Sequence, residues 1–182
     1  MDKIKGKHFF ITGAGRGLGA AFAVVFSDLG ANVTISGRNP ENLYSLAESI
    51  RLRCGTKPET VVMDMADISE VTTFGKKCRD ENRPLDILIN NAGILRDKSF
   101  TKMTLDDFRL VVEVHLMGAV NCTKAVWDVM RAQNYGRIVM TTSSSGLYGN
   151  FGQANYGAAK MALVGLMQTL ALEGEKHDIK VN

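Results

Sequence analysis

The chain has 182 residues, of which 45% are hydrophobic and 23% charged, and its formal net charge is +3 at pH 7. This balance is typical of one globular domain with a sizeable core, so a single domain over residues 1–182 is expected. The charges are scattered and form no basic stripe, which argues against nucleic acid or an anionic membrane as the main partner.

The N-terminal segment has no apolar stretch followed by the small-residue cleavage site of a signal peptide. No apolar run in the sequence is long enough to cross a bilayer. The three cysteines, Cys54, Cys78 and Cys122, are widely spaced and lack metal-ligand pairing. The lack of pairing argues against a metal site. An odd number of cysteines argues against a disulfide framework, so we expect free thiols and a reducing compartment. The cytoplasm is the expected location, with the peroxisome as the alternative for a eukaryotic protein.

Apolar runs alternate with amphipathic segments along the whole chain. In the first half, strands are expected at residues 8–12, 32–36, 60–63 and 86–90, and helices at residues 17–29, 40–53 and 69–81. A long helix is expected at residues 104–132, with Thr104 as its N-cap and two aspartates in its first turn. A fifth strand at 137–142, a helix at 154–175 and a sixth strand from 179 follow. Strict alternation of strands and helices predicts an α/β fold, a doubly wound parallel sheet of the Rossmann type.

A glycine-rich turn joins the first strand to the first helix, where a dinucleotide-binding fold places its pyrophosphate. The common G-x-G-x-x-G spacing from Gly13 would need a glycine at Leu18, whereas the glycines fit G-x-x-x-G-x-G through Gly13, Gly17 and Gly19. A tight strand-to-helix turn without a ligand is the alternative. The sequence therefore predicts cofactor contacts from this turn, at Gly13, Gly15, Arg16, Gly17, Leu18 and Gly19.

The residues after the second strand bear on the type of dinucleotide. An acidic residue at this place bonds the adenosine ribose in NAD-binding proteins, but here the chain reads Ser36-Gly37-Arg38. Arg38 offers a planar fork of donors to a 2′-phosphate, and Arg16 in the glycine turn could reach the same phosphate. Each arginine taken singly could instead be a solvated surface charge. Together with the missing acid they favour NADP over NAD.

Three residues in the second half suggest acid–base chemistry. Ser143 follows the fifth strand, Tyr156 lies at the start of the next helix, and Lys160 follows four residues later. Positions i and i+4 share one helix face, so phenol and ammonium can share a pocket where the cation stabilises the phenolate. The alternative for each residue alone is an ordinary surface position.

From about residue 7 to 182 the chain resembles the short-chain dehydrogenase/reductase family, on the glycine spacing, the Ser143/Tyr156/Lys160 set and the motif Asn90-Asn91-Ala92-Gly93. The resemblance implies that Tyr156 is the general acid/base, that Ser143 hydrogen-bonds the reacting oxygen and that Lys160 holds the nicotinamide ribose. It also implies that Asn91, Ala92 and Gly93 shape the cofactor pocket and that Asp64 binds the adenine amino group, although Asp64 lies beside a helix-capping Asp67.

Residues 91–100 and 148–156 resemble the (3R)-hydroxyacyl-CoA dehydrogenase domains of peroxisomal multifunctional β-oxidation enzymes. His115 fits as well, because those domains carry a histidine where many relatives have a catalytic asparagine. The favoured interpretation of His115 is nevertheless a satisfied helix histidine without a proton role. Those domains usually have an acid after the second strand, so Gly37-Arg38 favours NADP and the reductive direction, as in 3-oxoacyl reductases.

The expected function is therefore an NADP-dependent interconversion of a 3-oxoacyl and a (3R)-hydroxyacyl thioester. A dehydrogenase for another carbonyl, such as a steroid, sugar or xenobiotic, and a non-catalytic cofactor-binding subunit are the alternatives. Relatives pair through two long helices, so a homodimer or homotetramer is expected by analogy. The chain stops at Val181-Asn182, where relatives continue with a substrate loop, helices and a final strand, so the C-terminal strand and that loop are expected to be absent from this chain.

Overall fold

The computed structural model describes residues 3–81 and 84–182. Within them, six parallel strands form one sheet in the order β3-β2-β1-β4-β5-β6. Its strands are β1 (His8–Ile11), β2 (Asn32–Gly37), β3 (Glu59–Val62), β4 (Ile87–Asn90), β5 (Gly136–Met140) and β6 (Ile179–Val181). The predicted doubly wound parallel sheet is confirmed.

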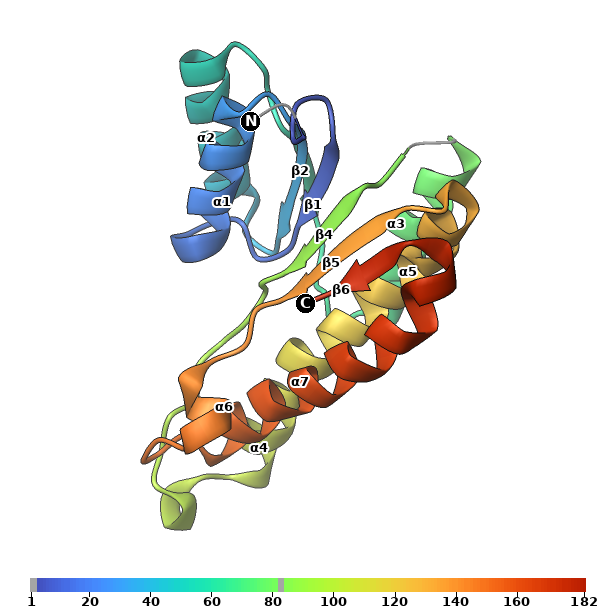
Figure 1. Cartoon of the computed structure of the whole chain (residues 1–182). Coiled ribbons are helices and arrows are strands. Elements are labelled where there is room, and N and C mark those ends of the chain that lie inside the picture. The colour runs from blue at the N-terminus through green and yellow to red at the C-terminus, as the bar shows by residue number, and fades with distance from the viewer. Residues whose placement is uncertain (1–2, 82–83) are drawn as a thin grey trace.

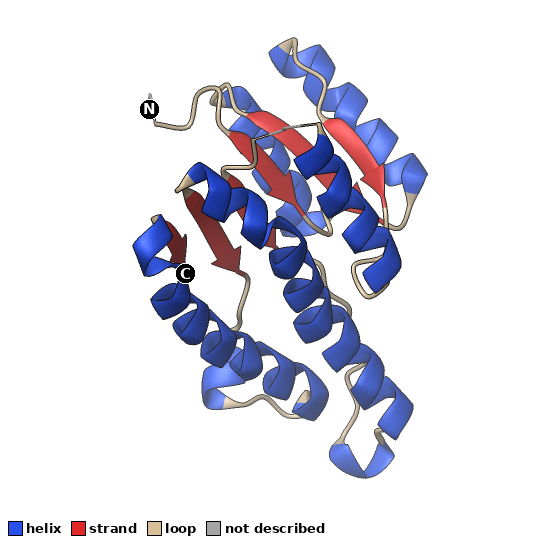
Figure 2. Ribbon diagram, turned by 90° about the vertical axis from the view of Figure 1, so that its right-hand side faces the viewer, coloured by secondary structure: helices blue, strands red, loops and turns tan. Residues whose placement is uncertain are grey.

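Helices cover both faces of this sheet (Figures 1 and 2). One side carries α1 (Gly17–Asp28) and α2 (Pro40–Cys54), and the other carries α3 (Ile68–Asp80), α5 (Gly118–Gln133) and α7 (Ala154–Gly174). Two shorter helices, α4 (Leu105–Val112) and α6 (Ser144–Tyr148), lie beyond the carboxyl ends of β4 and β5. The result is a three-layer α/β arrangement in which every crossover returns to a parallel strand.

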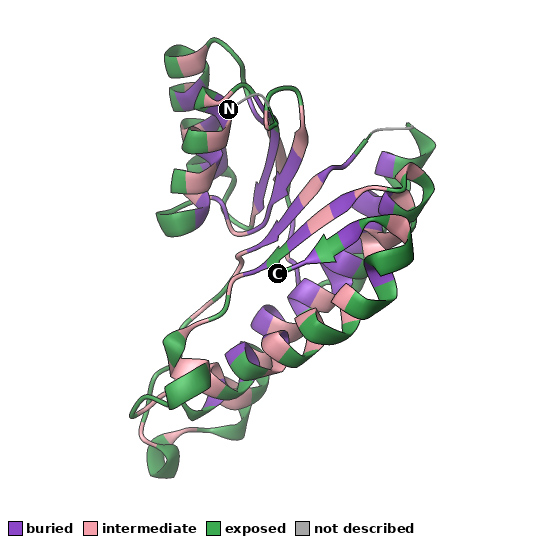
Figure 3. Ribbon diagram, viewed as in Figure 1, coloured by how far each residue is buried: buried purple, intermediate pink, exposed green. Residues whose placement is uncertain are grey.

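Successive residues of a strand point to opposite faces, and this alternation divides the core in two. Ile11 and Ile35 pack with α1 and α2, while Phe10, Leu88 and Ile138 pack with α3, α5 and α7. All five side chains are fully buried, and Figure 3 shows the buried residues concentrated on the strands and on the inward faces of the helices. The continuous apolar runs in the sequence thus correspond to strands covered on both faces.

The sheet reverses its winding between β1 and β4, which are neighbours although five elements, α1 to α3, lie between them in the chain. In open α/β sheets a crevice forms outside the carboxyl ends of the strands at such a point. The loops after β1 and β4 meet there, since Asn91 Nδ2 donates to Thr12 O at 3.1 Å and Ala92 N donates to Thr12 Oγ1 at 3.1 Å.

The structure departs from the sequence prediction between residues 104 and 132. The predicted continuous helix is α4 followed by a π-helical turn, Glu113–Met117, and then α5. Helix α6 and two 3₁₀ turns, Phe100–Lys102 and Glu175–His177, were not predicted, because segments of three to five residues are too short to show a helical period. Thr104 caps α4 as predicted, accepting a hydrogen bond from Asp107 N.

No helix in the described ranges 3–81 and 84–182 is long and apolar enough to cross a membrane. Over the same residues, no group of three or more metal-ligating side chains comes together.

Candidate active site

The turn after β1 is shaped by glycines. Gly13 (φ +65°) and Gly17 (φ +59°) adopt the left-handed backbone conformation that glycine alone reaches without cost. A Cβ on Gly13 would lie 2.6 Å from Ala92 Cα, and one on Gly19 would lie 2.6 Å from Gly13 O, so side chains there would push the turn away from the β4 loop and from α1. A Cβ on Gly17 would meet only open space. The turn from Gly13 to Gly19, called the glycine cradle below, therefore leaves open space in front of α1.

The N-terminus of α1 differs from those of the three helices that follow it. Side chains of Asn39, Asp67 and Thr104 cap α2, α3 and α4, and each of these helices carries an acidic residue in its first turn. Among the described residues, α1 has neither a side-chain cap nor an acid in its first turn. Its first N–H groups and the positive end of its dipole are left for an anion, which fits the pyrophosphate of a dinucleotide.

The carboxyl end of β2 lies beside this cradle, since a Cβ on Gly37 would be 3.8 Å from Gly15 N. Arg38 follows and pairs with Asp64, with 3.7 Å between Nη1 and Oδ2. Both side chains are exposed, and exposed pairs of this kind contribute little to stability, so the guanidinium can exchange the carboxylate for another anion. The structure thus brings together the two residues predicted for the adenosine end, while Arg16 and Leu18 are exposed at the start of α1.

The predicted acid–base residues follow β5 and lie in the first turns of α7. Ser143 follows β5 as the N-cap of α6, and its Oγ accepts a hydrogen bond from Ser145 N at 3.2 Å. Tyr156 lies in the first turn of α7 and Lys160 one turn further along. Helices α6 and α7 pack closely, since a Cβ on Gly157 would come 3.0 Å from Ser145 O. This packing brings the serine turn against the helix that carries the tyrosine and the lysine.

Lys160 is only 3% exposed, and its Nζ donates to Thr141 O at 2.5 Å. The ammonium lies 5.6 Å from the centroid of the Tyr156 ring. Burial disfavours the charged form and lowers the pKa of Lys160 to about 8. A buried cation therefore stands beside the half-buried phenol, as the i, i+4 spacing predicted.

His115, in the π-helical turn, is buried and meets Tyr156 edge to face, with 5.2 Å between ring centroids. Its Nε2 lies 3.0 Å from Ile94 N and 2.8 Å from Ile94 O, and a Cβ on Gly93 would overlap the imidazole. Burial lowers the pKa of His115 to about 4, so the ring is neutral near pH 7. The histidine fits against the loop after β4 rather than facing solvent.

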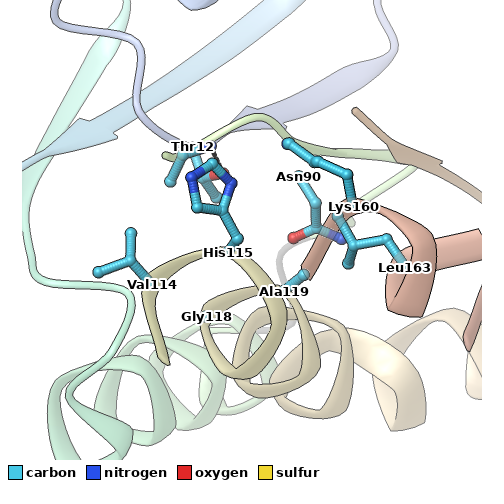
Figure 4. A pocket seen from close by; sticks show the side chains of 9 residues that line it. Thr12, Asn90, Val114, His115, Gly118, Ala119, Lys160 and Leu163 are labelled. Carbon is cyan, nitrogen blue, oxygen red and sulfur yellow. Dashed lines mark hydrogen bonds between the residues drawn. The ribbon is translucent and has the colours of Figure 1, made fainter. Parts of the chain in front are cut away.

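A small cavity lies behind these residues, lined in part by Thr12, Asn90, His115 and Lys160. Figure 4 shows the His115 ring, the Asn90 amide and the Lys160 side chain arranged around it. Two buried polar atoms, Asn90 Oδ1 and His115 Nδ1, have no hydrogen-bond partner among the described residues. The amide nitrogen of Asn90 is held by Thr123 Oγ1 at 3.1 Å.

The structure also contains site residues that the sequence reasoning missed. Thr12 Oγ1 anchors the Asn91-Ala92 turn, Thr141 O holds the ammonium of Lys160, and Asn155 is fully buried next to Tyr156. The roles of Thr12 and Thr141 leave no sequence pattern. Asn155 left a weak signal, because asparagine inside a helix is unfavourable unless its side chain bonds the backbone nearby.

Comparisons with known proteins agree with this arrangement. Residues 7–182 match the family model described as short chain dehydrogenase. The chain is 44% identical to the peroxisomal multifunctional enzyme A of Dictyostelium discoideum over 187 residues, which cover 98% of this chain and 42% of that protein. It is 36% identical to a 3-oxoacyl-[acyl-carrier-protein] reductase of Synechocystis, covering 100% of this chain and 74% of the reductase.

A solved structure of NAD⁺-bound xylitol dehydrogenase superposes with a TM-score of 0.92 at 34% identity, covering 99% of this chain and 69% of the other. The chain spans less than half the length of the peroxisomal relative. The glycine cradle, the Ser143/Tyr156/Lys160 set and the matched family model agree, and the chain belongs to the short-chain dehydrogenase family of NAD(P)-binding oxidoreductases.

Proposed function

We propose that this chain interconverts a ketone and a secondary alcohol, with Tyr156 as general acid/base, Ser143 as a hydrogen-bond donor to the reacting oxygen and Lys160 as the supporting cation. One observation carries the proposal: a half-buried phenol stands beside a buried ammonium at the carboxyl edge of the sheet, in the crevice that also holds the glycine cradle. The intact set of Ser143, Tyr156 and Lys160 counts against a non-catalytic cofactor-binding subunit, which would not need all three.

The cradle fits a dinucleotide, so the residues that would hold it can be named. The turn from Gly13 to Gly19 and the start of α1 would receive the pyrophosphate, and Asn91, Ala92 and Gly93 would shape the pocket beside it. Tyr156 and Lys160 would hold the nicotinamide ribose. The bound nicotinamide supplies or accepts the hydride. Asp64, which pairs with Arg38, would bind the adenine amino group.

In the reductive direction the residues have separate tasks. Tyr156 donates its phenolic proton to the alkoxide that develops on the substrate. Ser143 Oγ already accepts a bond from Ser145 N, which leaves its O–H free to donate to the same oxygen and stabilise the developing charge. Lys160 stabilises the phenolate left after proton transfer. His115 packs against the Tyr156 ring and, because its pKa is about 4, is not the proton donor near pH 7 in this proposal.

We propose NADP as the cofactor because Gly37-Arg38 lacks the acid that would repel a 2′-phosphate and because Arg38 and Arg16 are exposed beside the cradle. Each charged hydrogen bond to the phosphate contributes about 1.5–3 kcal/mol. Titration calorimetry is expected to give tighter binding of NADPH than of NADH, and Arg38→Ala is expected to reduce that difference. NADH affinity equal to that of NADPH, or an unchanged preference in Arg38→Ala, contradicts this assignment.

The proposed substrate is a 3-oxoacyl thioester, reduced to the R-alcohol in the cytoplasm or the peroxisome. Support comes from residues 91–100 and 148–156 and from the names of two relatives, a peroxisomal multifunctional enzyme and a 3-oxoacyl-[acyl-carrier-protein] reductase. A panel of ketones assayed by NADPH absorbance, with chiral analysis of the product from acetoacetyl-CoA, tests it. An S product, or no turnover alongside fast reduction of a steroid, sugar or xenobiotic ketone, argues for another substrate.

We further propose that the chain forms a homodimer or homotetramer through its two long helices, α5 and α7. Residues 161–172 of α7 contain no charged side chain, and Met161, Gly165 and Leu172 are exposed on that helix. Helices that are apolar all round are usually buried on all sides. A second copy of the chain is the partner that the analogy with relatives suggests.

A further inference from the structure

The first turn of α7 is tied down in an unusual way. The first N–H groups of a helix have no partner within the helix, and the N-cap side chain normally accepts from one at the second or third position. Gln153, the N-cap residue of α7, makes no such bond. Instead, the N–H of Tyr156, at the third position, donates to Asn155 Oδ1 at 2.7 Å. The group capped from inside the helix is therefore the backbone of the tyrosine.

The other end of the Asn155 side chain reaches two further segments. Its Nδ2 donates to Arg96 O at 3.2 Å and to Asp107 O at 3.5 Å. Arg96 lies in the loop that follows β4, and Asp107 lies in the first turn of α4. Asn155 is 0% exposed, so one buried amide uses its acceptor and both donors to join three elements around the tyrosine.

The lysine beside the phenol is anchored separately. Lys160 Nζ is fixed by Thr141 O, at the end of β5, and does not depend on the first turn of α7. The Tyr156 ring meets the edge of His115 and lies near the ammonium of Lys160, but neither contact fixes the position of the first turn of α7. The relative placement of phenol and ammonium therefore depends on the backbone of Tyr156, which Asn155 holds. A displacement of about 1 Å at a reacting group can lower a rate by about 100-fold.

We propose that Asn155 is a positioning residue for Tyr156: it fixes the tyrosine backbone to the loop after β4 and to α4, and so sets where the phenol stands relative to Lys160. The inference rests on the proposed role of Tyr156 as proton donor. Asn155 touches neither substrate nor cofactor in this role and acts through the tyrosine.

Two substitutions and a matched control test this role in the full chain. Asn155→Ala removes all three bonds, and Asn155→Ser keeps a hydroxyl that can accept from a first-turn N–H. The control, Gln153→Ala, removes the bond from Gln153 Nε2 to Asp97 Oδ2, which links the same helix start to the same loop, and the bond that Gln153 Oε1 accepts from Asn150 Nδ2. Neither bond involves Tyr156. NADPH titration gives the concentration of binding sites and the Kd, and kcat per site is then measured in H₂O and D₂O with the best ketone of the panel.

For Asn155→Ala we expect kcat per site to fall at least about 10-fold, on the scale of a misplaced catalytic group, with the NADPH Kd within about threefold of wild type. The solvent isotope effect on kcat is expected to rise, because proton transfer from a displaced phenol becomes slower relative to the other steps. Asn155→Ser is expected to recover part of the rate. Gln153→Ala is expected to keep the wild-type kcat per site and isotope effect.

Activity that falls only in proportion to the binding sites, with an unchanged isotope effect, would show a purely structural role and overturn the inference. An equal effect of Gln153→Ala would overturn it too. If Asn155→Ala does not fold, Asn155→Ser decides by the same criteria. A parallel Tyr156→Phe variant separates the two hypotheses: near-normal turnover in that variant refutes the acid role itself, whereas an inactive Tyr156→Phe with unaffected Asn155 variants refutes only the positioning role.

Discussion

Lys160 is a residue whose burial opposes folding. Its pKa is lowered from 10.5 to about 8 because the ammonium is removed from water, and none of the ion pairs among the described residues includes it. Below pH 8 both the folded and unfolded states carry the proton, and the folded state is less stable by about 3 kcal/mol, at 1.36 kcal/mol per pKa unit. The cost disappears as pH rises through 8 to 10.5. A residue retained at this expense is better explained by chemistry than by stability.

Tyr156→Phe is the most direct test of the acid–base assignment. The substitution removes one hydroxyl and keeps the ring that packs on His115, so fold and thermal midpoint are expected to stay close to wild type. NADPH binding is expected within a few-fold of wild type, while kcat falls at least about 100-fold, the scale of lost acid–base catalysis. Lys160→Ala, by contrast, is expected to lower both kcat and cofactor affinity. Steady-state kinetics with cofactor titration measure all three, and a Tyr156→Phe enzyme with near-normal turnover would require another proton donor.

The residues that sequence could and could not predict differ in a physical way. That Tyr156 and Lys160 lie near one another could be predicted, because this proximity depends on spacing along one helix, and spacing is visible in a sequence. Asn155 and Asn90 were not assigned to the site, because their roles depend on burial and on partners 33 to 59 residues away. Contacts at such separations are set by tertiary packing, which no local pattern records.

At the scale of elements, the helix predicted at 104–132 shows where periodicity fails. Apolar spacing continues through residues 113–117, so the sequence gives no sign of a break, yet the chain forms a π-helical turn there. Such turns often occur at functional sites, and this one carries His115 against Ile94 and Tyr156. Helix α6 was missed because its five residues, Ser144–Tyr148, are too few to show a helical period, and its N-cap Ser143 was assigned to chemistry alone.

Pairing of two copies of the chain through α7 can be tested by a substitution at Gly165. Gly165 is exposed, and a Cβ there would meet nothing within 4 Å, so a long side chain can be added without a clash inside one chain. If α7 pairs with a second copy, Gly165→Arg places a charge in an apolar interface and is expected to give a monomer with an intact fold. Light scattering after size exclusion gives the mass, and circular dichroism checks the fold. Lys176→Arg, beyond the helix, is the control; a wild-type mass in Gly165→Arg would exclude this face.

For the whole molecule, alternation of strands and helices was sufficient to predict the layers and the parallel sheet, because a parallel pair needs a crossover and helices are the crossovers. Which strands become neighbours was not predicted. The observed order places β4 beside β1. The loops that follow these two strands are joined by hydrogen bonds between Thr12 and the Asn91-Ala92 turn, and no sequence pattern records these contacts.

The pH dependence of stability is the prediction that concerns the molecule as a whole. Burial lowers the pKa of His115 from 6.5 to about 4, so between these values the unfolded chain binds a proton that the folded chain does not. The free energy of unfolding is therefore unaffected by this group above pH 6.5. It falls as pH falls toward 4, by up to about 3 kcal/mol. Three surface carboxylates add a further loss of stability that begins at lower pH, and such exposed pairs contribute little. Their pKa values are lowered by hydrogen bonds from basic side chains: Asp28 by Arg53, Glu48 by Arg51 and Asp107 by Lys98.

Urea unfolding at steps between pH 7.5 and 4 measures this loss in wild type, in His115→Asn and in a control, His177→Asn, which changes a half-buried histidine in the 3₁₀ turn after α7. His115→Asn leaves a different cavity and shifts the free energy of unfolding at every pH, so the informative quantity is its slope with pH. Between pH 6.5 and 4.5 that slope is expected to be much shallower in His115→Asn than in wild type and unchanged in His177→Asn. Turnover of His115→Asn near pH 7 is expected to stay within a few-fold of wild type, because Nε2 is held by the backbone of Ile94 and a ring with a pKa of about 4 does not carry the extra proton of an acid catalyst at that pH. Parallel slopes in all three proteins would mean that His115 titrates normally in the fold, and a large loss of turnover would return it to the list of proton donors.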